Sequence, residues 1–152
     1  MVSASQRPAR SGLWRCCGGL FATGVEHLRT VVRDARARHR IKSEFAALDR
    51  CGELDPMLRD FGFDRSAAPK IVDNHPRAPR RLSAMLQRLG IEPTAEQQQS
   101  TEMREIQRTC LVCGAGGKCD HWLAVGKPGE DRSFCPNAEA LDRLSGKARQ
   151  QS

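Results

Sequence analysis

The sequence predicts an all-α protein, and three features of its 152 residues support this prediction. The chain is rich in leucine, alanine, arginine and glutamine, which favour helix. Apolar residues recur at helical spacing, and no segment alternates β-branched and polar residues as a half-buried strand would. Only 5% of the residues are aromatic and tyrosine is absent, so the core must be small. We therefore expect a small helical bundle with a cysteine-lined loop cage, preceded by an arginine-rich N-terminal helical arm.

The arm forms the first part of the chain. We expect residues 1–19 to be disordered and an arginine-rich helical segment to cover residues 20–75. The run RDARARHR separates two apolar stretches of this segment, so either one long helix or two adjoining helices would fit. The apolar positions at helical spacing are Leu28, Val32 and Ala35 before the run, and Ile41, Phe45 and Leu48 after it.

Two short helices should follow within the same segment. Leu54, Leu58 and Phe61 share one helical face, and Gly62 suits the left-handed position that ends a helix. Asp64 or Ser66 can then cap a second short helix. Two prolines in residues 74–79 indicate a linker, because a residue that precedes proline is disfavoured in helix.

The expected cysteine-motif domain covers residues 78–146, followed by a disordered tail at 147–152. A stripe of leucine and methionine predicts a helix that Gly90 ends, and Thr94 with Gln97 forms a capping box for the next helix. Continuing that helix brings Cys110 one turn after Ile106. A final helix should start at Pro136. The predicted inward-facing residues are Leu82, Met85, Leu86, Leu89, Met103, Ile106, Leu141 and Leu144.

Four cysteines form the most informative pattern in the sequence. Cys110 and Cys113 are separated by two residues, Cys119 follows after five more, and Cys135 after another fifteen. Two thiolates at the first spacing can face one ion when the backbone turns between them, and the glycines between Cys113 and Cys119 free that backbone. We therefore predict that these four thiols bind a metal.

Several occupants fit four thiols. Zinc accepts four thiolates in a tetrahedron, and CLVCG resembles half of a zinc knuckle. A cubane iron–sulfur cluster is slightly favoured, because Cys135 followed by Pro136 matches the closing Cys-Pro of bacterial ferredoxins. The thiols could also be free or redox-paired. His121 could replace a ligand, and Cys51 fits either a small core residue or a surface thiol.

The charge pattern suggests a second function. The net charge is +7, and residues 1–50 carry ten Arg and Lys against four Asp and Glu. A basic arm of this kind can contact RNA or an acidic protein, because neutralising phosphates releases counterions. The candidate contact residues are Arg33, Arg36, Arg38, Arg40 and Lys42.

The first 25 residues do not form a signal-peptide core, and no apolar run is long enough to span a membrane. We therefore expect a cytoplasmic protein, in which cysteines are more often thiols or metal ligands than disulfides. No nucleophile lies beside a base, and four thiolates would leave zinc no open coordination position, so we expect no enzyme activity.

Two segments resemble known families. The stretch from Leu82 to Leu144 is similar to an uncharacterised, mainly proteobacterial domain family, through MLQRLGIEP, the C-x2-C-x5-C spacing, WL and FCPNA. This resemblance implies that Trp122 and Asn137 accompany the motif cysteines. Residues 48–66 resemble the short arginine-rich YjiS-like domain, some members of which are implicated in RNA turnover.

The leading hypothesis is a small cytoplasmic protein that binds zinc or an iron–sulfur cluster, with a structural or a redox- or iron-sensing role. The alternatives are an RNA-binding regulatory adaptor that acts through the basic helix, and a thiol redox protein.

Overall fold

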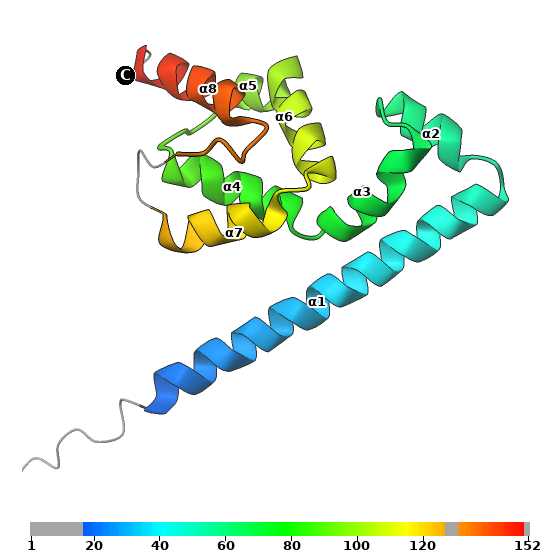
Figure 1. Cartoon of the computed structure of the whole chain (residues 1–152), viewed down its shortest axis with the longest axis horizontal. Coiled ribbons are helices and arrows are strands. Elements are labelled where there is room, and N and C mark those ends of the chain that lie inside the picture. Colours follow the sequence, from blue (N-terminus) through cyan, green and yellow to red (C-terminus); the bar gives the residue numbers. More distant parts are fainter. Residues whose placement is uncertain (1–16, 127–130, 151–152) are drawn as a thin grey trace, which may run out of the picture. The chain divides into compact units, whose positions relative to one another are not determined.

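The computed structural model describes residues 17–126 and 131–150 of the chain. Within these ranges it contains eight α-helices and one 3-10 turn, and no strand (Figure 1). The predicted all-α fold is therefore confirmed. The chain divides into two compact units, residues 1–35 and residues 36–152, and the division falls inside the first helix.

Helix α1, Cys17–Arg50, runs through the whole arm without a break. Of the two arrangements that the sequence left open, one long helix is correct. The first unit, as far as it is described, is the N-terminal half of this helix, and Val25, Leu28 and Val32 are exposed on it. Residues 1–16 of the predicted disordered segment lie outside the described residues. No helix in the described ranges combines the length and apolarity needed to cross a bilayer.

The second unit begins with a small core built from short helices. Helix α2 is Leu54–Asp60, a 3-10 turn spans Arg65–Ala67, and helix α3 is Ala68–Asn74. Gly62 ends α2 with a φ of 72°, and Asp64 caps the 3-10 turn by accepting a 2.7 Å hydrogen bond from the backbone N–H of Ser66. Buried Leu54, Leu58 and Ile71 form the core, against which Phe45 and Leu48 of α1 pack.

Five further helices follow, and four of them, together with Ile91, form the larger core of this unit. Gly90, with a φ of 64°, follows α4, and Thr94 and Gln97 form the predicted capping box of α5. The core residues are Leu82, Met85, Ile91, Met103, Ile106, Trp122, Leu141 and Leu144. The helices are α4 Ala78–Arg88, α5 Ala95–Gln99, α6 Thr101–Val112, α7 Gly116–Val125 and α8 Ala138–Gln150.

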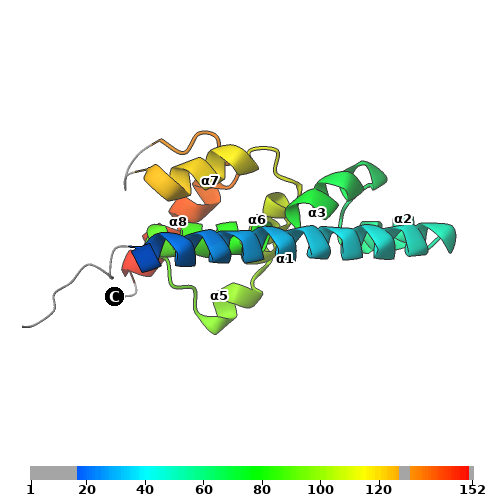
Figure 2. The same cartoon turned by 90° about the horizontal axis from the view of Figure 1, so that it is seen from below.

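Helix α4 is central to this arrangement, since it packs against both α6 and α7. Helices α5 and α7 lie on opposite sides of it in Figure 1 and in Figure 2. The C-terminal end of α6, the start of α7 and the turn before α8 are the segments that carry the four motif cysteines.

Three local expectations differ from the structure. The cysteine cage is not made of loops alone, because Cys110 lies within α6 and Cys119 within α7. The last helix starts at Ala138 rather than at Pro136, because the carbonyl of Asn137 accepts its first helical hydrogen bond, from the N–H of Leu141. The same helix runs to Gln150 and so enters the region expected to be a disordered tail.

Candidate metal centre

The four motif cysteines come from three neighbouring elements. Cys110 lies in the last turn of α6, and Cys113 is the residue at which that helix ends. Cys119 lies one turn into α7, and Cys135 lies in the turn that precedes α8. All four thiols are reduced and half-buried. The fold therefore brings Cys135 close to three residues that precede it by 16 or more positions.

These four residues line a single small cavity. Its volume is about 30 Å³, and Leu82, Met85 and Leu141 of the larger core form its apolar wall. The side chains of Arg81 and Asn137 complete the lining. The predicted cysteine set therefore surrounds one common space inside the larger helical core.

Burial makes these thiols harder to ionise. It raises the pKa of Cys110 and of Cys119 from the ordinary value of 9.0 to about 11, and it raises the pKa of Cys135 as well. The thiols also raise one another's pKa: Cys135 acts on both Cys110 and Cys119, and Cys113 acts on Cys135. In the metal-free protein, Cys110 and Cys119 are therefore protonated at neutral pH.

Three N–H groups point at the sulfur atoms, and the two from Asn137 oppose this effect at Cys110 and Cys135. The side-chain amide of Asn137 donates to Cys110 Sγ at 3.4 Å and to the carbonyl of Ile106 at 3.0 Å. The backbone N–H of Ala115 donates to Cys113 Sγ at 3.3 Å, and the backbone N–H of Asn137 lowers the pKa of Cys135. Such donors stabilise a thiolate, the form that binds metals.

A charged network borders the same cavity. Arg81 of α4 donates two short hydrogen bonds to the Asp120 carboxylate, from Nε at 2.7 Å and from Nη2 at 2.6 Å. Its Nη1 donates to Oδ1 of Asn74 at 3.4 Å. The amide of Asn74 in turn donates to the carbonyls of Leu111 and Cys113, at 3.1 and 3.0 Å. The network thus ties α3, α4 and α7 to the segment that carries Cys113.

Comparison with known families places this region in a defined group of proteins. Residues 70–147 match the family described as a family of unknown function, DUF6455. The chain belongs to this family. The matched segment contains all four cysteines, Arg81, Asp120 and the whole larger core. The expectation of an uncharacterised domain family is thereby confirmed, whereas the cysteine motif of that family and the likeness to the YjiS-like domain stay predictions. No curated protein and no solved structure matched the chain.

The cysteines of this DUF6455 member surround the cavity without forming a finished ligand set. Among the described residues, no group of three or more His, Cys, Asp and Glu side chains is arranged so that it could hold a metal ion. The assignment of the four cysteines as ligands therefore stays a prediction.

Other residues singled out in the sequence lie elsewhere. His121 is exposed and lines a different pocket, together with Lys118 and Asp131. Trp122 is buried in the larger core and is not part of the cysteine cavity. Cys51 is exposed, which makes it a surface thiol rather than a core residue. Cys16 lies outside the described residues.

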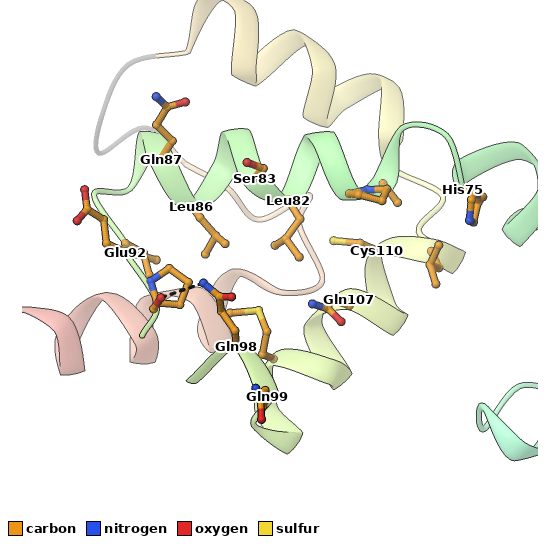
Figure 3. Close-up of a pocket in the computed structure, with 16 residues that line it drawn as sticks. His75, Leu82, Ser83, Leu86, Gln87, Glu92, Gln98, Gln99, Gln107 and Cys110 are labelled. Carbon is orange, nitrogen blue, oxygen red and sulfur yellow. Dashed lines mark hydrogen bonds between the residues drawn. The ribbon is translucent and has the colours of Figure 1, made fainter. Parts of the chain in front are cut away.

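A larger cavity of about 910 Å³ lies between α4, α5 and α6. Figure 3 shows Leu82 and Leu86 pointing into it from α4, with Glu92 at one end and Cys110 at the other. Gln98 faces into the same space and donates a 3.2 Å hydrogen bond to the carbonyl of Pro93. Cys110 and Leu82 belong to the linings of both this cavity and the cysteine cavity.

The five candidate contact residues of the arm all lie on α1, four of them exposed and Arg38 half-buried. Arg40 donates a 2.8 Å hydrogen bond to the carboxylate of Glu44, one turn further along the helix. The five basic residues do not form a single stripe. At 100° per residue Arg33, Arg36 and Arg40 share one side of the helix, whereas Arg38 and Lys42 share the opposite side.

Proposed function

We propose that this member of the DUF6455 family binds a single zinc ion through Cys110, Cys113, Cys119 and Cys135. The observation that carries the proposal is that four thiols, separated by up to 25 positions in sequence, line one small cavity inside a helical core. Four thiolates are a complete tetrahedral ligand set for zinc. Each thiol sulfur is carried by a single rotatable bond, so a change of rotamer can bring it toward the centre without moving the backbone.

The cavity has room for one ion as it stands. Its volume of about 30 Å³ exceeds the roughly 10–15 Å³ that a cavity needs to hold one water molecule. A cubane cluster contains eight iron and sulfide atoms and would require the cavity to expand. The Cys135–Pro136 sequence keeps an iron–sulfur cluster as the alternative occupant.

The position of the cysteines supports a structural role for the ion. The four ligands would join α6, α7 and the turn before α8, all of which pack on the same small core. Binding energy at such a site contributes directly to folding. Oxidation of the thiols would release the ion and loosen the same three elements, which allows the centre to report redox conditions.

The ionisation of the thiols argues against the thiol-redox alternative. A nucleophilic cysteine needs a lowered pKa, because the thiolate is the reactive form. Burial instead raises the pKa of Cys110 and Cys119 to about 11.

The deciding experiment measures zinc, iron and acid-labile sulfide per chain, together with the visible spectrum, after anaerobic purification. We expect one zinc per chain and no colour. Cys119→Ser and Cys135→Ser should lose the metal, because each removes one of the four proposed ligands. Both residues line the small cavity and not the larger one, so the loss can be assigned to the small cavity. Cys51→Ser, which alters an exposed thiol, should keep the metal. Iron with an equal amount of acid-labile sulfide, together with a brown colour, would show that the site holds an iron–sulfur cluster and not zinc. A metal-free protein in which all four thiols titrate freely would refute the metal site.

A second candidate function is RNA binding through the basic arm. The observation in its favour is the exposure of Arg33, Arg36, Arg40 and Lys42 on α1. In this case the cysteine centre would serve only to stabilise the fold.

A further inference from the structure

Arg81 combines features that a structural arginine does not need. Its side chain is only 13% exposed, and the residue is part of the lining of the cysteine cavity. The guanidinium acts electrostatically on Cys119, whose pKa it lowers against the larger opposing effect of burial. Cys113 and Cys119 act on the guanidinium in return. The paired carboxylate of Asp120 acts on Cys119 in the opposite direction, so the guanidinium is held as part of an ion pair beside two of the four proposed ligands.

Neighbouring groups fix this charge in one position. Asp120 binds the guanidinium through two of its nitrogens, and Asn74 accepts a bond from the third. Gly116 leaves room for it, because a Cβ atom at that position would lie 2.5 Å from Arg81 Nη1. A guanidinium has five N–H groups, and these bonds use three, so two further donors remain on the group that lines the cavity.

The charge of the proposed centre favours a positive group close to the ligands. Four thiolates around one divalent zinc ion carry a net charge of −2, and burying uncompensated charge is costly. Arg81 is the cation within the lining of the cavity.

We propose that Arg81 is the positioning residue of the metal centre, whose guanidinium offsets the negative charge of the zinc–thiolate group at Cys113 and Cys119 and thereby sets the affinity of the site. This inference rests on the proposed metal binding. It adds that Asp120 and Gly116 influence metal affinity indirectly, because they hold the Arg81 guanidinium in place.

Two pairs of variants of the full chain test this role. Arg81→Met removes the charge, and its control is Arg88→Met, seven residues further along the same helix. Arg88 also ties α4 to α7, through the carbonyls of Leu123 and Gly126 and the ring of Trp122, but it does not line the cysteine cavity.

The second pair moves the charge without deleting it. Gly116→Ala should displace the guanidinium from its present position, because the added Cβ atom would collide with it. Gly117→Ala makes the same change in the same turn of α7, where an added Cβ meets nothing within 4 Å.

The readouts are zinc affinity, from competition with the chelator 4-(2-pyridylazo)resorcinol, and the thiolate-to-metal absorption of the cobalt(II)-substituted protein. We expect Arg81→Met to weaken zinc binding by about 10- to 100-fold, as for other groups that orient metal ligands. Arg81→Lys should recover part of this loss, because it restores the charge without the planar fork. Gly116→Ala should cause a smaller loss, and the absorption band should shift in both weakened variants. Arg88→Met and Gly117→Ala should leave affinity and spectrum unchanged.

Equal effects of Arg81→Met and Arg88→Met on zinc affinity would overturn the inference, because Arg81 would then act only by joining α4 to α7. An unchanged affinity and spectrum in Arg81→Met would do the same, with the proposed metal site intact. Failure of the unaltered protein to bind zinc or cobalt would instead overturn the metal site, and this inference with it.

Discussion

Ionisation of Cys110 and Cys119 links the stability of the metal-free protein to pH. Both thiols have a pKa of about 11 in the folded chain, against an ordinary value of 9.0. Between these two values the unfolded chain has lost protons that the folded chain still holds, so the free energy of unfolding falls as pH rises. The stabilising contribution is complete below pH 9 and is lost as pH rises toward 11.

We therefore expect the metal-free protein to unfold at a lower urea concentration at pH 10.5 than at pH 8. Tyrosine is absent, so no phenol contributes to the change. Cys119→Ser should reduce the difference between the two pH values, whereas Cys51→Ser, which alters an exposed thiol, should leave it unchanged. An identical difference in unaltered protein and Cys119→Ser would contradict this prediction.

At the scale of residues, sequence spacing was enough to select the four cysteines but not Arg81. Arg80 and Arg81 are adjacent, and nothing in composition distinguishes them. One signal was present: Arg81 shares a helical side with Ala78 and Met85, three positions before and four after, and both of these are buried. An arginine on a buried face needs a partner, but its partner Asp120 lies 39 positions away, and only the folded chain brings the two together.

At the scale of elements, two helix-ending glycines offer a direct comparison. Gly52 and Gly62 both have positive φ values, 76° and 72°. A Cβ atom at Gly52 would meet nothing within 4 Å, whereas one at Gly62 would collide with the guanidinium of Arg108. That guanidinium donates a 2.8 Å hydrogen bond to the Gly62 carbonyl and lies over the ring of Phe63.

We expect Gly52→Ala to lower the free energy of unfolding by about 1 kcal/mol, the cost of left-handed backbone in a residue with a Cβ. Gly62→Ala should cost about 1 kcal/mol more, because Arg108 must also give up its hydrogen bond. Chemical denaturation measures both changes. In an Arg108→Met background the two glycine variants should cost the same, and a difference that survives there would show that Arg108 is not its source.

Helix ends were predictable where the signal is local. The capping box at Thr94 and Gln97, and the stops at Gly62 and Gly90, depend on residues within one turn of each other. The start of α8 was not predictable in this way. Pro136 suits a first turn, but the buried amide of Asn137 is held by the carbonyl of Ile106, 31 positions earlier, and the helix begins after it.

At the scale of the whole molecule, charge is distributed unevenly, and the effect of this distribution on RNA binding can be tested. The net charge is +7, and residues 1–50 hold ten basic and four acidic residues. Reversing five basic residues to glutamate lowers the net charge by ten, from +7 to −3, wherever the changes are made. Two such variants of equal charge therefore separate the position of the charges from their total.

We expect the unaltered protein to bind single-stranded RNA with an affinity that falls as salt rises. Glutamate at all five arm positions should abolish retention, because the phosphate contacts are lost. The control carries five reversals outside α1 and should retain binding with its salt dependence preserved. Equal losses in both variants would assign the effect to net charge alone. The arm positions are Arg33, Arg36, Arg38, Arg40 and Lys42, and the control positions are Arg59, Lys70, Arg104, Lys118 and Arg143.

The fold class could be predicted from periodicity, since α4, α6 and α8 each carry an apolar stripe. The spacing of the cysteines could suggest that they converge but could not show it, because Cys135 reaches the cavity only when α8 packs on the larger core through Leu141 and Leu144. Whether RDARARHR breaks the arm was also undecided, since both arrangements place the same residues in helix.

Cys110 is a wall shared by the cysteine cavity and the 910 Å³ cavity between α4, α5 and α6. Any replacement of this thiol therefore reshapes both spaces at once, and a defect in such a variant has two possible origins. Cys119 and Cys135 line the cysteine cavity but not the larger one, so substitutions at these positions affect the cysteine cavity without changing the lining of the other. In a living cell, a phenotype seen with Cys110→Ser but absent with Cys135→Ser would trace to the larger chamber.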